Sequence, residues 1–294
     1  MEDERKKYRV GMASVISSMT IWGFMPIYWQ ALIPIDSYVI ILYRLVLAGL
    51  TCFIAALVTY GLAGIKEPLG DKKKLTKLIL AGLVITANWS IYIYAINSYQ
   101  VIETCIGYYI DPLMVCAFGI IFFGERPTKH KLIAIVFACL GVMIVLLHFM
   151  RFPLIALAIA MTFACYTAIK KHLKMKPLVS LLYETVFIAP FALTIIIYME
   201  ANGKGAFLAA QPYQLVLLAF AGVLTALPLA LFAAAANRIS MISIGIAGYV
   251  SPSINLIIGV FLFKEPFDHV QFIAFAVIWV GLVFFTYGEI KENR

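Results

Sequence analysis

Long apolar stretches separated by short polar gaps run along the whole chain. Ten of these stretches are about 20 residues long, which is the length that a helix needs to cross the ~30 Å hydrocarbon core of a bilayer. Glycine and proline gather in the gaps, as expected where helices end. The ten predicted spans are 10–30, 37–60, 75–97, 101–123, 130–149, 153–171, 178–200, 213–236, 240–262 and 268–288.

The composition agrees with this pattern. Of the 294 residues, 63% are hydrophobic and 13% are charged, whereas soluble domains are about half apolar and a quarter charged. We therefore expect an all-α integral membrane protein with no room for a soluble catalytic domain. The net charge of +8 does not indicate nucleic-acid binding, because the basic residues are scattered through short gaps rather than gathered on one face.

The lysines and arginines predict how the chain crosses the membrane. If the N-terminus is cytoplasmic, 19 of the 23 Lys and Arg residues lie on the cytoplasmic side, with Lys170 counted in the gap after the sixth span. Three lie on the opposite side, and Arg44 lies inside the second span. Cytoplasmic loops of membrane proteins carry an excess of these residues, so we expect both termini in the cytoplasm.

The second half of the chain repeats the first at a constant shift of 140 residues. Each unit holds five predicted spans, and an odd number makes the second unit enter the membrane from the opposite side. The sequence thus predicts two inverted five-helix repeats, residues 1–150 and 151–294. The matches include Gly82 with Gly222, Tyr109 with Tyr249, Pro112 with Pro252, Glu125 with Glu265 and Gly141 with Gly281.

Prolines interrupt two matched spans near their middle, at Asp111-Pro112 and at Ser251-Pro252. Proline removes one backbone donor and frees a carbonyl one turn earlier. In lipid that carbonyl needs protein or water as a partner, and matched interrupted helices mark the solute site of many secondary transporters. A simple packing kink is the alternative. The remaining kink candidates are Pro26 and Pro228.

Asp111 is the residue whose burial in the membrane is expected to cost the most free energy. A carboxylate at the bilayer centre costs several kcal/mol unless it is paired, hydrated or protonated. Asp111 is therefore a candidate proton carrier or a partner for a cationic group, and a protonated acid bonded to a neighbouring carbonyl is the alternative. Glu103 lies eight residues earlier on the same predicted helix face. It is the second proton-coupling candidate, or else a residue that reaches for lipid headgroups.

Arg44 and Glu184 occupy matching positions in the second and seventh spans. They are expected to differ in depth by roughly 10 Å, because each residue of a helix rises 1.5 Å. The sequence therefore predicts separate partners for the two side chains. Arg44 is the better candidate for an anionic group or a gate, and a structural role is the alternative for both.

Aromatic and amide side chains complete the candidate site. Tyr28, Trp29 and Tyr99 are expected in the aromatic belt at the membrane surface. Deeper side chains could form an amphipathic cage for an aromatic or cationic solute, although packing is the alternative for each one. These deeper candidates are Trp22, Asn88, Trp89, Tyr92, Tyr108, Tyr166 and Tyr249.

The five cysteines and four histidines show no metal-ligand spacing, and the chain has no nucleotide-binding loop. We expect no metal and no cofactor, and we do not expect an enzyme. An integral-membrane enzyme would need acids or histidines gathered at one interface. A lipid flippase or scramblase is the nearer alternative, and it would carry a lateral polar groove that faces lipid.

A series of short motifs spans nearly the whole chain. It comprises Ile21-Trp22-Gly23 with Pro26, Tyr43-Arg44, Asn88-Trp89, Glu103, Gly107-Tyr108, Pro112, Gly124-Glu125-Arg126, Tyr183-Glu184-Thr185, Pro190, Pro228 and Ala233-Ala234-Ala235. In this order and spacing, the motifs resemble the drug/metabolite transporter (DMT) superfamily in its EamA family, most closely the RarD-like branch.

The resemblance implies a carrier of the bacterial inner membrane that works by alternating access. It implies that spans 1, 3, 4, 6, 8 and 9 surround a central cavity, with spans 5 and 10 at the periphery. Asp111-Pro112 departs from the Asn-Pro expected in that pattern, which leaves the charge preference and the coupling of this chain open.

The sequence as a whole predicts a secondary transporter in the cytoplasmic membrane that moves a small polar or amphipathic metabolite or drug, by export. Proton linkage and facilitated diffusion both remain open. The expected partners are the small-molecule substrate and the lipid bilayer, without nucleic acid, and the expected assembly is a monomer or a weak homodimer.

Overall fold

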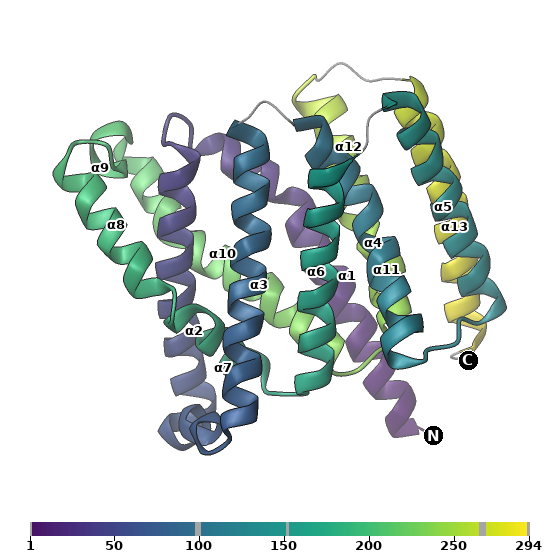
Figure 1. The fold of residues 1–294 in the computed structure, drawn as a ribbon, viewed down its shortest axis with the longest axis horizontal. Coiled ribbons are helices and arrows are strands. Elements are labelled where there is room, and N and C mark those ends of the chain that lie inside the picture. Colours follow the sequence, from purple (N-terminus) through teal and green to yellow (C-terminus); the bar gives the residue numbers. More distant parts are fainter. Residues whose placement is uncertain (1, 98–100, 151–152, 265–268, 293–294) are drawn as a thin grey trace.

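The computed structural model describes residues 2–97, 101–150, 153–264 and 269–292, which form a bundle of helices (Figure 1). Helices satisfy every backbone hydrogen bond internally, which the bilayer interior requires. The first half contains α1 (Glu2–Ala31), α2 (Ser37–Lys66), the short 3₁₀ helix η1 (Glu67–Gly70), α3 (Lys72–Asn97), α4 (Val101–Phe123) and α5 (Lys129–Phe149). The second half contains α6 (Leu154–Leu173), α7 (Pro177–Val186), α8 (Ala189–Ala201), α9 (Ala206–Ala209), α10 (Pro212–Ala236), α11 (Met241–Gly248), α12 (Val250–Ile257), the π-helical turn η2 (Ile258–Leu262) and α13 (His269–Glu292).

Nine stretches of the described chain are helical, long and apolar enough to cross a membrane, and α7 with α8 makes a tenth if the bent pair is one span. The prediction of ten spans is confirmed. The expectation of a continuous span over 178–200 is wrong, because α7 and α8 meet at an angle of 52°. The bend falls just before Pro190, and a residue that precedes proline is disfavoured in helical geometry.

The predicted span 240–262 is also interrupted. α11 ends at Gly248, and α12 begins after Tyr249. Pro252 cannot donate to the carbonyl of Gly248, four residues earlier, so the break lies where the proline removes a helix hydrogen bond. The second span ends where the sequence predicts, since Gly61 has a φ of 64° that interrupts α2.

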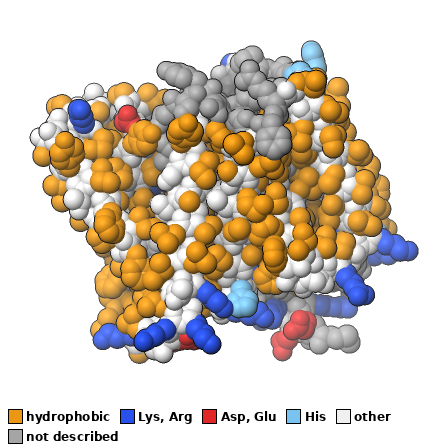
Figure 2. Space-filling view, viewed as in Figure 1, with side chains coloured by type: hydrophobic (Ala, Val, Ile, Leu, Met, Phe, Trp, Pro, Cys, Tyr) orange, Lys and Arg blue, Asp and Glu red, His pale blue; other side chains and the backbone are white. Residues whose placement is uncertain are grey.

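Both ends of the described chain lie on one face of the bundle, named here the termini face, and the opposite side is named the far face (Figure 1). Lys and Arg side chains gather along the termini face in the view of Figure 2, whereas hydrophobic side chains cover the body of the bundle. α4 runs from the far face to the termini face, and α11 with α12 runs the opposite way. This confirms the two inverted five-helix repeats.

The matched glycines lie where helices approach most closely. A Cβ atom on Gly82 of α3 would lie 2.4 Å from the carbonyl oxygen of Glu184 in α7. A Cβ atom on Gly222 of α10 would lie 2.4 Å from the carbonyl oxygen of Leu47 in α2. Each distance is too short for any side chain, so glycine at these two positions lets equivalent helix pairs of the two repeats pack backbone to backbone.

α5 and α13 form a pair at one edge of the bundle, as the family resemblance implies (Figure 1). Their contact is symmetric. A Cβ atom on Gly141 would lie 2.9 Å from the carbonyl oxygen of Ala274, and one on Gly281 would lie 3.1 Å from that of Ala134. Ala134 and Ala274 are themselves related by the 140-residue shift.

The two repeats meet in the centre, where α4 packs against α11. A Cβ atom on Gly245 would lie 2.5 Å from the carbonyl oxygen of Pro112. The Tyr249 hydroxyl donates to the carbonyl of Tyr109, its own counterpart in the first repeat, at 2.9 Å. This contact places the two proline-interrupted spans side by side.

The close approach at Gly222 generates a stability prediction. Gly222→Val should destabilise the fold by about 1–3 kcal/mol, because the new side chain must displace the backbone of α2. Gly70→Val is the matched control, since a Cβ atom at Gly70 has no neighbour within 4 Å. The melting temperature of the purified proteins in detergent measures both. Equal melting temperatures for the Gly222 and Gly70 variants would contradict the close packing of α10 on α2.

Candidate functional site

A cavity of about 340 Å³ lies between the two repeats. Residues of α1, α2, α3, α4, α6, α10, α11 and α12 line it, and no described residue of α5 or α13 does. The resemblance implies this arrangement except for α2, which contributes Arg44. The lining extends from Met19 and Leu229 in the middle of the bundle to Ile33 and Ser37 beside the α1–α2 connection at the far face.

Arg44 is the cation of this cavity wall. Its guanidinium carbon lies 4.6 Å from the ring centre of Trp29 and 5.2 Å from that of Trp89, so two indole rings contact it. Its Nε donates to the Thr225 hydroxyl at 3.2 Å. Arg44 forms no ion pair with any described carboxylate. Aromatic rings stabilise a cation without neutralising it, so the guanidinium can still bind an anion.

Trp29 was expected in the surface belt, and that expectation is wrong. Its ring lines the cavity and packs edge to face on Tyr28, with ring centres 4.7 Å apart. The Tyr28 hydroxyl in turn donates to the carbonyl of Leu217 in α10 at 2.7 Å. The attraction between the indole and the Arg44 guanidinium explains this inward orientation.

Two polar side chains of the cavity wall, one from each repeat, have an oxygen atom without a hydrogen-bond partner. The Oδ1 atoms of Asp111 in α4 and of Asn255 in α12 are buried and accept no hydrogen bond. Buried acceptors without donors are costly, so both atoms are available to a donor from a bound molecule. Sequence reasoning missed Asn255, although a signal existed, since it is a lone amide in an apolar run one turn after Pro252.

Several other predicted residues also line the cavity. Asn88 donates through Nδ2 to the carbonyl of Ile159 at 2.8 Å and to the Thr162 hydroxyl at 2.9 Å, which ties α3 to α6. Tyr92 and Tyr108 pack edge to face with ring centres 6.0 Å apart. The candidates that the structure brings to the cavity wall are Trp22, Arg44, Asn88, Trp89, Tyr92, Tyr108 and Asp111.

Three candidates remain, of which two lie away from the cavity wall. The side chain of Glu103 lies outside the described residues, and so does the belt candidate Tyr99. Tyr249 is buried in the contact between the repeats, with its hydroxyl on Tyr109. Tyr166 is fully buried, and its hydroxyl donates to Glu184 at 3.0 Å. Both tyrosines are held by protein acceptors, so neither is presented to a solute.

The four prolines take two kinds of position. Pro112 and Pro252 line the cavity from opposite repeats. Pro26 and Pro228 lie inside α1 and α10, where the Ser18 hydroxyl donates to the carbonyl of Pro228 at 2.7 Å.

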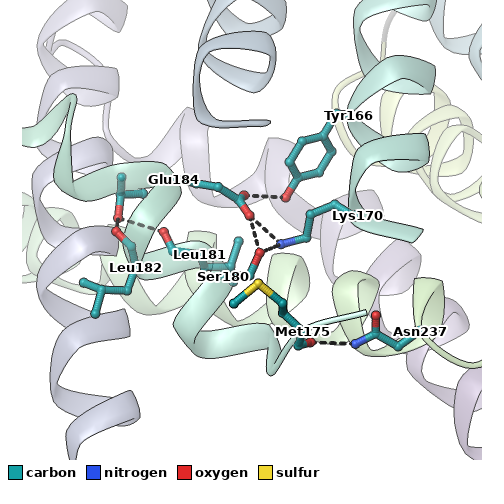
Figure 3. A network of polar contacts seen from close by, with 9 residues as sticks. Tyr166, Lys170, Met175, Ser180, Leu181, Leu182, Glu184 and Asn237 are labelled. Carbon is teal, nitrogen blue, oxygen red and sulfur yellow. Dashed lines mark hydrogen bonds and ion pairs between the residues drawn. The ribbon is translucent and has the colours of Figure 1, made fainter. Parts of the chain in front are cut away.

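A buried ion pair lies on the termini-face side of the bundle, between α6 and α7 (Figure 3). Lys170 Nζ lies 2.5 Å from a carboxylate oxygen of Glu184, and each side chain is only 2% exposed. Ser180 accepts from Lys170 and donates to Glu184, each at 2.7 Å. Glu184 and Arg44 thus have separate partners, as the depth argument predicts. Assigning Lys170 to a solvent-exposed gap was wrong, because α6 continues past it to Leu173.

A second polar contact closes the two repeats against each other on the termini face. The Glu125 carboxylate follows α4 and accepts from the backbone N–H groups of Met241 and Ile242 at 2.9 and 3.0 Å. These N–H groups belong to the first turn of α11, where a carboxylate is favourable. Lys171 Nζ lies 3.4 Å from Glu125 and donates to the carbonyl of Ile239 at 2.6 Å. We name these contacts the Glu125 latch.

Comparison with known proteins decides the family. The model of the EamA-like transporter family matches residues 9–147 and again residues 151–287. The chain belongs to this family. It is 33% identical to the uncharacterized transporter YojE of Bacillus subtilis (97% of this chain, 96% of that protein) and 32% identical to protein RarD of Streptomyces exfoliatus (97% and 91%). A solved crystal structure with 15% identity covers 94% of this chain and 97% of its own, with a TM-score of 0.74, and shares the fold.

The family match and the apolar helices together make the chain a multi-pass membrane transporter. Within the described residues, no three His, Cys, Asp or Glu side chains gather as a metal-ligand set. The cavity therefore offers a solute one guanidinium, one carboxylate, amides, hydroxyls and aromatic rings.

The buried ion pair generates a stability prediction. Glu184→Gln should destabilise the fold by about 3–5 kcal/mol, because Lys170 keeps a buried charge without its counter-charge. The double variant Lys170→Met with Glu184→Leu should recover most of this loss. Glu67→Gln is the control, since its pair with Lys176 is exposed and surface pairs contribute little. Melting in detergent measures all three, and a Glu184→Gln protein as stable as Glu67→Gln would refute the buried charge pair.

Proposed function

We propose that this protein is a secondary transporter of the cytoplasmic membrane that exports a small polar or amphipathic solute by alternating access. The observation that carries the proposal is the position of the cavity. It lies in the middle of the bundle, is lined by both repeats and reaches the far face, whereas the Glu125 latch joins the repeats on the termini face. A solute site near the midplane between inverted repeats is the usual construction of secondary transporters.

The proposed orientation follows from charge. Lys and Arg side chains gather along the termini face (Figure 2), and cytoplasmic loops carry an excess of these residues. The termini face is therefore assigned to the cytoplasm. In this orientation the described conformation is accessible from outside the cell and closed by the latch on the cytoplasmic side.

The moving bodies in this proposal are the two repeats, residues 1–150 and 151–294. They meet at several helix contacts, and the central one is that of α4 with α11, where Gly245 lets the helix backbones approach closely. A small-residue contact permits a rocking motion about the cavity with little side-chain obstruction. Opening toward the cytoplasm then requires that Glu125 release the first turn of α11.

Asp111 is proposed as the coupling group. It is a carboxylate of the described cavity wall with a buried oxygen that has no hydrogen-bond partner, so it can bind a proton in one half of the cycle and a cationic solute group in the other. Arg44, Tyr92 and Tyr108 are the other ionisable side chains that line the same cavity. Glu103 remains a second proposed coupling residue.

A lipid flippase is disfavoured by the same geometry. It would need a polar groove that opens sideways to lipid. The unpartnered oxygens of Asp111 and Asn255 are instead buried, and the lining side chains come from helices that surround the cavity.

Labelling of a cavity cysteine tests alternating access without knowledge of the solute. Ser251 lines the cavity, so Ser251→Cys in a background without the five native cysteines should react with an impermeant thiol reagent from either membrane side. Adding Glu125→Gln should raise the labelling rate from the termini face several-fold, because the ion pair with Lys171 is lost. Oriented membrane vesicles distinguish the two sides.

Glu67→Gln serves as the control, since this exposed residue lies on the termini face away from the latch. Labelling that is confined to one side in every variant would end the alternating-access proposal.

Proton coupling is tested by the pH dependence of flux. A solute is first found by a thermal-shift screen of amino acids, amines and antibiotics, since ligand binding to the folded state raises the melting temperature. In proteoliposomes, Asp111→Asn should abolish the change of flux with pH between about pH 5 and pH 8, because the amide cannot exchange a proton. A pH profile that the variant leaves unaltered would remove Asp111 from the coupling.

A further inference from the structure

A basic and an acidic side chain line the same cavity without forming an ion pair with each other. Arg44 has no ion pair with a described carboxylate, and Asp111 has none with a described cation. Uncompensated charges inside a membrane protein are expensive and mark solute pathways. We propose that the transported solute is a dipolar ion with a carboxylate at one end and an ammonium group at the other, separated by a short apolar body.

Arg44 supplies the anion site. Trp29 and Trp89 hold the guanidinium at 4.6 and 5.2 Å, and Thr225 accepts only from Nε. No described residue accepts a hydrogen bond from the terminal nitrogens of Arg44. A planar guanidinium with free terminal donors binds a carboxylate through two parallel hydrogen bonds.

Asp111 and Asn255 supply the cation site. Their Oδ1 atoms are buried acceptors without donors, one from each repeat. An ammonium group carries three donors and no acceptor, so it suits a wall that offers carboxylate and amide oxygens without donors. A carboxylate beside an amide oxygen repels an anion, which fixes the direction in which the solute binds.

Arg44 of α2 and Asp111 of α4 line the cavity from different helices without pairing with each other, so a solute that reaches both must carry separated charges. Tyr108 of α4 lines the same cavity as Arg44 of α2. Asp111 lies three residues beyond Tyr108 on α4, about 4.5 Å deeper along the helix. The ammonium and carboxylate groups of an α-amino acid are bonded to the same carbon, whereas an apolar spacer sets the two groups further apart. Trp22 and Phe163 line the wall and provide apolar surface for this spacer.

Calorimetric titration of the purified full-length protein with three matched compounds tests the proposal. 4-(Aminomethyl)benzoate carries both charges across a ring, benzylamine keeps only the cation and 4-methylbenzoate keeps only the anion. The wild-type protein should bind the dipolar compound about ten-fold or more tightly than either of the others, as expected for a second charge-assisted hydrogen-bond set. Phenylalanine should bind more weakly than 4-(aminomethyl)benzoate.

Variants assign each charge to its site. Arg44→Gln should bind the dipolar compound and benzylamine equally, and Asp111→Asn should bind the dipolar compound and 4-methylbenzoate equally. Arg44→Lys keeps the charge but not the planar guanidinium, so it should retain a smaller preference for the dipolar compound. It also replaces Arg44→Gln in the test if that variant fails to fold. Glu67→Gln is the control and should behave like the wild-type protein.

Equal affinities of the wild-type protein for all three compounds, or tighter binding of phenylalanine, would overturn the proposal. The inference rests on the proposed function only in taking the cavity as the solute site. Two-sided labelling of Ser251→Cys without a preference for the dipolar compound would therefore refute the solute class and leave the transporter intact. A preference for the dipolar compound together with labelling from one side only would refute alternating access and leave the solute class intact.

Discussion

A polar group in the interior of a membrane protein must find a partner, and this constraint organises the whole chain. Helices satisfy the backbone, and most deep side chains bond to a neighbouring helix, as Asn88 does to α6 and Glu184 does to Lys170. The exceptions in the cavity wall are Asp111 and Asn255, each with an oxygen that has no donor. Burying a polar group without a hydrogen bond costs free energy in an apolar interior. The presence of two such groups in one cavity therefore indicates that a solute, a water molecule or a proton binds to them during the transport cycle.

The inverted repeat explains why the cavity lies where it does. Two five-helix units of opposite direction place their proline-interrupted spans against each other, and Tyr249 bonds to the carbonyl of its counterpart Tyr109 across this contact. Matched glycines allow equivalent helix pairs to approach at equivalent points. The symmetry is broken at Arg44 and Glu184. These residues occupy matching positions of the two repeats but have different surroundings. One is a cation of the cavity wall, and the other is neutralised in a buried ion pair.

Hydrophobic patterning predicted the fold well, because span length and charge bias are strong signals in a membrane protein. The ten spans and the repeat could be read from the chain, whereas the peripheral position of α5 and α13 was implied only by the family resemblance. The bend between α7 and α8 could not, since it depends on packing around Pro190. Lys170 was misassigned for a related reason. A lysine one residue from a span end looks solvated, and only the hairpin about Pro177, which brings residue 170 to residue 184, shows that it is buried. Trp29 faces the cavity because of a tertiary contact with Arg44, which no local pattern encodes.

The central claim is that the repeats move against each other around the cavity and open the termini face. Spin labels at Arg126, beside the latch, and at Arg238, before α11, would measure this directly, since both side chains are exposed and lie on opposite repeats. Pulsed electron spin resonance of the labelled protein in lipid should give two distance populations, with Glu125→Gln enriching the longer one. A single narrow distance that is the same with and without this substitution would contradict the account.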